Sequence, residues 1–136
     1  MATPARFAED LRVLVVDDDT DTLELEELLF RSSGADVRVA RSGRAALQLS
    51  TGWPPTALVT ELYLQDMTSF RLAEGLRSMR AGRPPLRVIA VTSRGTLQDR
   101  MRAAEAGFDV FLAKPVDLDG LLRVVVGIHP RPRAVV

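Results

Sequence analysis

The sequence predicts an α/β fold: a doubly wound parallel sheet of five strands with helices on both faces. Short continuous apolar runs rich in Val, Leu and Ile recur along the chain, and segments with helical spacing separate them. Such runs are typical of strands buried on both faces. Because a strand is followed by a helix five times in succession, the strands should be parallel and joined by right-handed crossovers. A chain of 136 residues is long enough for one such domain.

The five expected strands are residues 11–16, 36–40, 56–60, 87–91 and 109–113. The first helix should begin near residues 19–21, which offer N-cap side chains, and Gly34 should end it. A short second helix is expected over residues 43–50. The apolar stripes predicted for the other four helices are Leu25, Leu28, Leu29 and Ser32; Phe70, Ala73, Leu76 and Met79; Leu97, Met101, Ala104 and Ala106; and Leu118, Leu121, Leu122, Val125 and Val126.

Residues 10–128 are expected to form the domain, with an N-terminal extension over residues 1–9 and a C-terminal tail over residues 129–136. The 18 basic and 18 acidic side chains cancel, so composition gives no reason to expect nucleic acid as a partner. No cysteine is present and the single histidine is His129, which excludes disulfides, thiolate metal sites and clustered-histidine sites. No apolar run approaches the length of a membrane helix, so no membrane association and a cytoplasmic location are expected.

Polar residues follow four of the predicted strands. They are Asp17 and Asp18, Glu61, Thr92, and Lys114. Because ligands of open α/β sheets bind outside the carboxyl ends of the strands, these residues should share one site. Clustered carboxylates suit Mg²⁺, a lysine can pair with a phosphate, and a hydroxyl can donate a hydrogen bond. Asp19 is best interpreted as a helix cap. Taken singly, Thr92 would be a strand-end hydroxyl bonded to its own backbone and Lys114 a surface lysine, but their joint position at the ends of successive strands favours the shared site.

Over residues 10–128 the sequence resembles the receiver domain of two-component response regulators, which has a flavodoxin-like (βα)5 fold. The resemblance lies in residues 15–19, in residues 91–93 and above all in residues 103–115. It implies that Lys114 contacts a phosphoryl group and that Thr92 is the switch hydroxyl. It further implies that Phe111 is the aromatic residue that changes rotamer on activation, and that the bond before Pro115 is cis.

The resemblance also implies a magnesium site. Asp18 and Glu61 would be direct ligands, the Tyr63 carbonyl a third, and Asp17 a ligand through water. The alternative is that Glu61 pairs with Lys114 and the site binds no metal.

The resemblance breaks at the third strand. The phospho-acceptor position, an Asp in typical receivers, is Glu61; a usual Pro is Gln65, a usual Gly is Ser69, and Ser93 replaces a smaller residue. One extra methylene moves the carboxylate by on the order of 1 Å, and misplacements of that size can cost about a hundredfold in rate. Asp66 lies further along the loop and is a poor substitute. We therefore expect little or no phosphorylation.

The leading functional hypothesis is an atypical, non-phosphorylated and non-enzymatic receiver that serves as a protein-interaction module. Its partners would be a sensor kinase, a phosphotransfer protein or an output protein. One alternative is a working phospho-receiver that switches with Mg²⁺-dependent phosphoryl transfer. Another is a small-ligand or nucleotide-binding α/β domain, which the absence of a glycine-rich loop after the first strand disfavours.

The expected partner surface is the face formed by residues 94–105, Phe111 and residues 118–126. In receivers this face often carries the signal, and a homodimer through it is a candidate assembly. Arg100 and Arg102 lie on it, and each by itself is best interpreted as a solvent-exposed charge.

Overall fold

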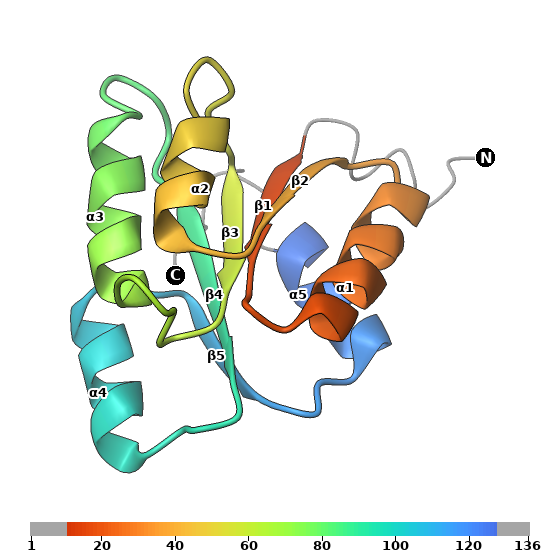
Figure 1. The fold of residues 1–136 in the computed structure, drawn as a ribbon, viewed down its shortest axis with the longest axis vertical. Helices are drawn as coiled ribbons and strands as arrows, with labels where there is room; N and C mark the ends of the chain where they lie inside the picture. The colour runs from red at the N-terminus through yellow and green to blue at the C-terminus, as the bar shows by residue number, and fades with distance from the viewer. Residues whose placement is uncertain (1–10, 128–136) are drawn as a thin grey trace.

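Strands and helices alternate throughout residues 11–127, which are the residues that the computed structural model describes (Figure 1). The strands are β1 (Arg12–Val16), β2 (Asp36–Ala40), β3 (Ala57–Thr60), β4 (Arg87–Thr92) and β5 (Val110–Ala113). The helices are α1 (Thr20–Ser32), α2 (Gly43–Leu49), α3 (Ser69–Ser78), α4 (Leu97–Glu105) and α5 (Leu118–Gly127). The five predicted strand–helix units are confirmed. The expected extension of residues 1–9 and the tail of residues 129–136 lie outside the described residues.

All strand pairs are parallel, in the order β2-β1-β3-β4-β5. The chain runs from β1 outward to β2 and then returns past β1 to β3, so the order reverses between β1 and β3. The register places Val16 beside Thr60 and Thr92 beside Ala113. The carboxyl ends of β1, β3, β4 and β5 therefore meet at one edge, where ligand sites of open α/β sheets form.

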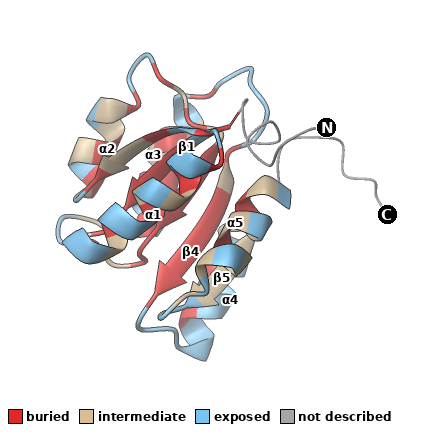
Figure 2. Cartoon of the chain, turned by 90° about the vertical axis from the view of Figure 1, so that its right-hand side faces the viewer, coloured by how far each residue is buried: buried red, intermediate tan, exposed pale blue. Residues whose placement is uncertain are grey.

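Two apolar cores lie on opposite faces of the sheet. One joins side chains of β1, β3 and β4 to Phe30 of α1 and Leu121 of α5. The other joins side chains of the same strands to Ala46 of α2 and Leu72 of α3. Figure 1 shows α1 and α5 on one side and α2 and α3 on the other, and Figure 2 shows buried strands beneath helices with exposed outer faces. Burial on both faces is what the continuous apolar runs predicted.

The predicted apolar stripe of α1 is wrong except for Leu29, which packs against the core, although the helix and its cap are confirmed. Asp19 caps α1 by accepting a hydrogen bond from the backbone of Thr22. However, Leu25 is 54% exposed and Leu28 is 65% exposed. The buried face instead carries Leu23, Glu26 and Phe30. A helical stripe predicted from apolar residues alone cannot include a buried glutamate. The prediction therefore assigned the wrong face of α1 to the core.

The same error occurs at α4. Leu97 and Met101 of the predicted stripe are 73% and 56% exposed, whereas Asp99 and Ala103 are buried. Asp99 is buried because it closes a capping box with Thr96 at the start of the helix. Within residues 11–127, none of the helices is long and apolar enough to cross a membrane.

Candidate functional site

Three of the predicted site residues meet at the carboxyl edge of the sheet. The Lys114 ammonium follows β5 and lies 2.7 Å from Oδ2 of Asp17, which follows β1. The same ammonium lies 3.2 Å from Oε1 of Glu61, which follows β3. We call Asp17, Glu61 and Lys114 the charge triad. The topology brings them together because each directly follows the end of a parallel strand.

Burial governs the electrostatics of the charge triad. Asp17 is 2% exposed, and burial raises its pKa above the usual value, while the hydrogen bond from Lys114 opposes that shift. Oδ1 of Asp17 also accepts a hydrogen bond of 2.9 Å from the backbone N–H of Asp19. For Lys114, burial alone would lower the pKa, but the hydrogen bond to Asp17 and the charges of both carboxylates raise it overall. Lys114 therefore remains a fixed positive charge.

Both carboxylate oxygens of Glu61 have partners. Oε1 faces Lys114, and Oε2 accepts a hydrogen bond of 2.8 Å from the backbone N–H of Leu62. Glu61 is only 9% exposed. Its extra methylene lets the carboxylate reach Lys114 and bend back onto the first residue of the following loop. The Glu61 side chain is thus held in the charge triad by its contacts with Lys114 and with the Leu62 backbone.

The Thr92 side chain makes no hydrogen bond to the charge triad among the described residues, and the contacts of Phe111 are to other groups. The Thr92 hydroxyl accepts a hydrogen bond of 3.1 Å from the backbone N–H of Arg94, which matches the simple strand-end interpretation. The Phe111 ring packs against Gly95, where an added Cβ would lie 2.9 Å from Cε1 of the ring. The guanidinium of Arg100 lies 4.8 Å from the ring centre. Glycine at position 95 is therefore needed for this placement of the ring.

The residues as placed do not fit a magnesium ion. The carboxylates of Asp17 and Glu61 share the Lys114 ammonium as their cation. Asp18 is half-buried, and its carbonyl accepts a hydrogen bond from Arg41. Within residues 11–127, no three acidic or histidine side chains gather in a way that could hold a metal ion. The pocket is arranged around a lysine counter-ion.

The loop after β3 has a role that the sequence did not reveal. The Asp66 carboxylate accepts hydrogen bonds of 2.9 Å from the backbone N–H groups of Gly43 and Arg44, at the start of α2. These bonds lower the pKa of Asp66. Met67 packs so closely over Gly43 that an added Cβ would collide with the Met67 side chain. Asp66 therefore ties the loop to α2 and takes no part in the charge triad.

Tyr63 links the same loop to α4. Its hydroxyl donates a hydrogen bond to Asp99, and Arg94 lies over its ring at 4.9 Å. The hydrogen bond raises the pKa of Tyr63 and lowers that of Asp99. Sequence reasoning considered only the Tyr63 carbonyl and missed this side-chain contact.

Two further expectations concern single residues. The peptide bond between Lys114 and Pro115 is cis, as predicted. Ser93 is exposed.

Comparisons with known proteins find relatives of this chain. The chain is 37% identical over 113 residues to an uncharacterised 14.6 kDa protein of Leptolyngbya boryana, covering 83% of this chain and 86% of that protein. It is 36% identical to the transcriptional regulatory protein PrrA of Mycobacterium leprae, covering 82% of this chain and 46% of PrrA. The chain thus spans less than half the length of that regulator.

Solved structures share the fold. A CheY-like response regulator receiver domain protein from Methanospirillum hungatei superposes with a TM-score of 0.77 at 26% identity, covering 87% of this chain and 92% of that chain. A response regulator protein from Burkholderia pseudomallei, solved with a phosphorylated aspartic acid and a calcium ion, gives a TM-score of 0.74 at 24% identity, covering 84% and 65%. The predicted flavodoxin-like fold is confirmed. The profile of the response regulator receiver domain matches residues 13–126, and the chain belongs to that family of two-component signalling domains.

Proposed function

We propose that this chain is an atypical receiver domain that acts without phosphorylation, as a protein-interaction module in two-component signalling. The observation that supports the proposal most is the double attachment of Glu61, to the Lys114 ammonium at 3.2 Å and to the Leu62 backbone N–H at 2.8 Å. A phospho-accepting carboxylate must present one free oxygen to the donor. Each Glu61 oxygen already has a partner, and the extra methylene moves the carboxylate on the order of 1 Å from the position of an aspartate carboxylate.

Glu61 also supplies part of what a phosphoryl group would supply. A carboxylate carries one negative charge, whereas a phosphoryl group carries nearly two and has three acceptor oxygens. The contact between Glu61 and Lys114 thus imitates a phospho-aspartate only in part. The Thr92 hydroxyl, bonded to Arg94, takes no share in this imitation. We infer one fixed pocket arrangement with partial active-like character.

Contacts around the pocket favour such a fixed arrangement. The hydrogen bond from Tyr63 to Asp99 joins the β3–α3 loop to the start of α4. The Phe111 ring packs against Gly95 in the segment that joins β4 to α4. Movement of that segment would require both contacts to change together. An input other than phosphorylation, such as a bound partner, would have to supply the energy.

Receiver domains typically bind Mg²⁺ for phosphorylation, and we propose that this one binds it weakly or not at all. Lys114 already pairs with the two carboxylates that a divalent ion would need. The chemistry that such an ion supplies elsewhere, charge neutralisation at a transferring phosphoryl group, is therefore not used here.

Receiver domains of two-component systems interact with kinases or other proteins. For this chain we propose a sensor kinase, a phosphotransfer protein or an output protein as partner, a non-enzymatic role in the cytoplasm, and no nucleic-acid contact. The face of α4, β5 and α5 is the proposed surface, and a homodimer through it is one candidate. On this face, the guanidinium of Arg100 lies over Phe111 and that of Arg102 lies over Phe70 at 4.5 Å. Both arginines are exposed, as expected, and each lies over an aromatic ring.

A phosphorylation-competent receiver is the second candidate. The observation that favours it is that Asp17 and Lys114 are in contact at the carboxyl edge, with Asp18 adjacent. The two candidates differ only in what Glu61 does.

Intact-mass measurement after incubation with acetyl phosphate and Mg²⁺ separates them. We expect no gain of a phosphoryl group by the wild-type chain. The Glu61→Asp variant restores the shorter side chain, and a gain of one phosphoryl group by it alone would show that the rest of the pocket is competent. Stoichiometric phosphorylation of the wild type that disappears in Glu61→Gln would overturn the proposal.

A further inference from the structure

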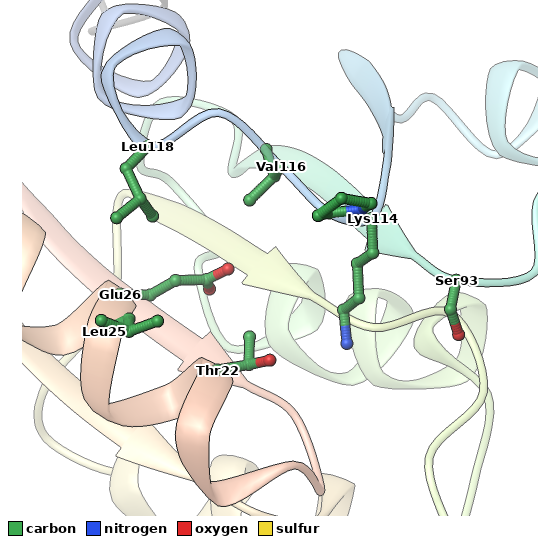
Figure 3. Close-up of a pocket in the computed structure, with 8 residues that line it drawn as sticks. Thr22, Leu25, Glu26, Ser93, Lys114, Val116 and Leu118 are labelled. Carbon is green, nitrogen blue, oxygen red and sulfur yellow. The ribbon is translucent and has the colours of Figure 1, made fainter.

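We propose that the cavity between α1 and the segment joining β5 to α5 binds a small molecule that carries an ammonium group on an apolar body. The cavity has a volume of about 450 Å³, within the range of roughly 300–1,000 Å³ that small-molecule sites occupy. Figure 3 shows its lining side chains converging from both sides. They are Thr22, Leu25, Glu26, Ser93, Lys114, Pro115, Val116 and Leu118.

Glu26 is the polar anchor of this site. It lies on the buried face of α1, is 2% exposed, and borders the cavity (Figure 3). Its Oε2 atom has no hydrogen-bond partner among the described residues. Burial of a carboxylate without a partner is costly, and buried polar atoms are nearly always hydrogen-bonded. A cation in the cavity would place a positive charge beside this buried carboxylate and so offset the cost of its burial.

The charges near the cavity favour a cation over an anion. Lys114 borders the cavity, but its ammonium is already bound to Asp17 at 2.7 Å and to Glu61 at 3.2 Å. Because two carboxylates share one ammonium, the charge triad is negative overall, and an ionised Glu26 adds to that negative charge. The Thr22 hydroxyl donates to Asp19 and so is also engaged. Among these polar side chains of the wall, Glu26 therefore remains as a hydrogen-bond acceptor, and its carboxylate suits a cation.

Apolar side chains make up most of the remaining wall. Leu25 is 54% exposed at the rim, and Val116 and Leu118 are half-buried on the opposite side. These side chains would cover a short alkyl or aryl group, while its ammonium reaches Glu26.

Burial, and then the nearby charge of Asp17, raise the pKa of Glu26 to about 7, while Lys114 opposes that shift. A bound ammonium would favour the ionised form.

The probe is n-hexylammonium, added at pH 8 to the full chain and followed by two-dimensional NMR. We expect saturable shifts at Thr22, Val116 and Leu118. Hexanoate, which has the same length and the opposite charge, and hexanol, which has none, should bind far more weakly. Saturation by hexanol at the same concentrations as hexylammonium would overturn the proposal, as would no saturation by any probe.

Glu26→Gln should weaken hexylammonium binding by about tenfold or more, because a hydrogen bond to a charged group is lost. Glu24→Gln is the matched control, since Glu24 is exposed on the same helix; it should leave affinity unchanged. Leu118→Trp fills the cavity while keeping Glu26 and should also abolish binding. Unchanged affinity in Glu26→Gln or Leu118→Trp, or an equal loss in Glu24→Gln, would contradict the assignment.

Discussion

Glu61 and Glu26 are both buried glutamates, but their surroundings differ. Lys114 contacts Glu61, whereas it only lines the same cavity as Glu26. Glu61, at 9% exposure, has a partner for each carboxylate oxygen. Glu26, at 2% exposure, has an oxygen without a partner among the described residues, and burial raises its pKa to about 7. A buried acid that is paired is a structural element, whereas an unpaired one costs stability. The first fits a pocket fixed by its own charges, and the second fits the proposed ammonium site.

Among these predictions, removing the Lys114 ammonium should change the free energy of unfolding most. In Lys114→Met, two carboxylates are left buried without their cation, and we expect a loss of about 2–4 kcal/mol in the free energy of unfolding. Urea unfolding at pH 7 measures it. Glu61→Gln added to Lys114→Met should recover part of the loss, since it removes one of the two charges. A loss below about 0.5 kcal/mol, the level of an exposed ion pair, would show that the charge triad contributes little.

Glu26 should make stability depend on pH in a defined direction. Its pKa is raised from the usual 4.5 to about 7, so between these values the folded state binds more protons than the unfolded state. The contribution of Glu26 to folding stability should therefore fall as pH rises through this window, by on the order of 3 kcal/mol, and then level off.

Urea unfolding from pH 4.5 to pH 8 tests this, with Glu26→Gln beside the wild type. Glu26→Gln should lack the fall in folding stability that Glu26 causes as pH rises, and it should be more stable than the wild type at pH 8. Glu24→Gln, on the exposed face of α1, should retain the decline. Parallel curves for the wild type and Glu26→Gln would show that Glu26 titrates normally.

A smaller effect is expected for the link between the β3–α3 loop and α4. Tyr63→Phe removes the hydrogen bond to Asp99 but keeps the ring beneath Arg94. We expect a loss of about 1 kcal/mol and faster amide hydrogen exchange in residues 93–97. The capping box of Thr96 and Asp99 remains, so α4 should persist. Unchanged exchange in that segment would mean that Tyr63 does not restrain it.

The strands and the strand-end residues were predictable from the sequence because each depends on local order. A continuous apolar run followed by a polar residue predicts a buried strand and places that residue at the sheet edge. The meeting of Asp17, Glu61 and Lys114 followed from that topology. The buried faces of α1 and α4 did not follow, because Glu26 and Asp99 occupy core-facing positions that apolar patterns assign to solvent.

Long-range side-chain contacts were also beyond sequence reasoning. Asp66 finds its partners in Gly43 and Arg44, and Tyr63 finds its partner in Asp99. Each contact joins a loop to a helix distant in the chain, and no local spacing marks either pair. Both lie in the loop where the resemblance to typical receivers breaks.

Calorimetric titration with Mg²⁺ at pH 7 tests most directly whether Lys114 is the counter-ion of the pocket. The wild type should give no saturable heat at millimolar Mg²⁺, because the Lys114 ammonium already pairs with Asp17 and Glu61. Lys114→Met combined with Glu61→Asp should bind the ion, since both carboxylates then lose their cation. A saturable site in the wild type that disappears in Glu61→Gln would contradict the account.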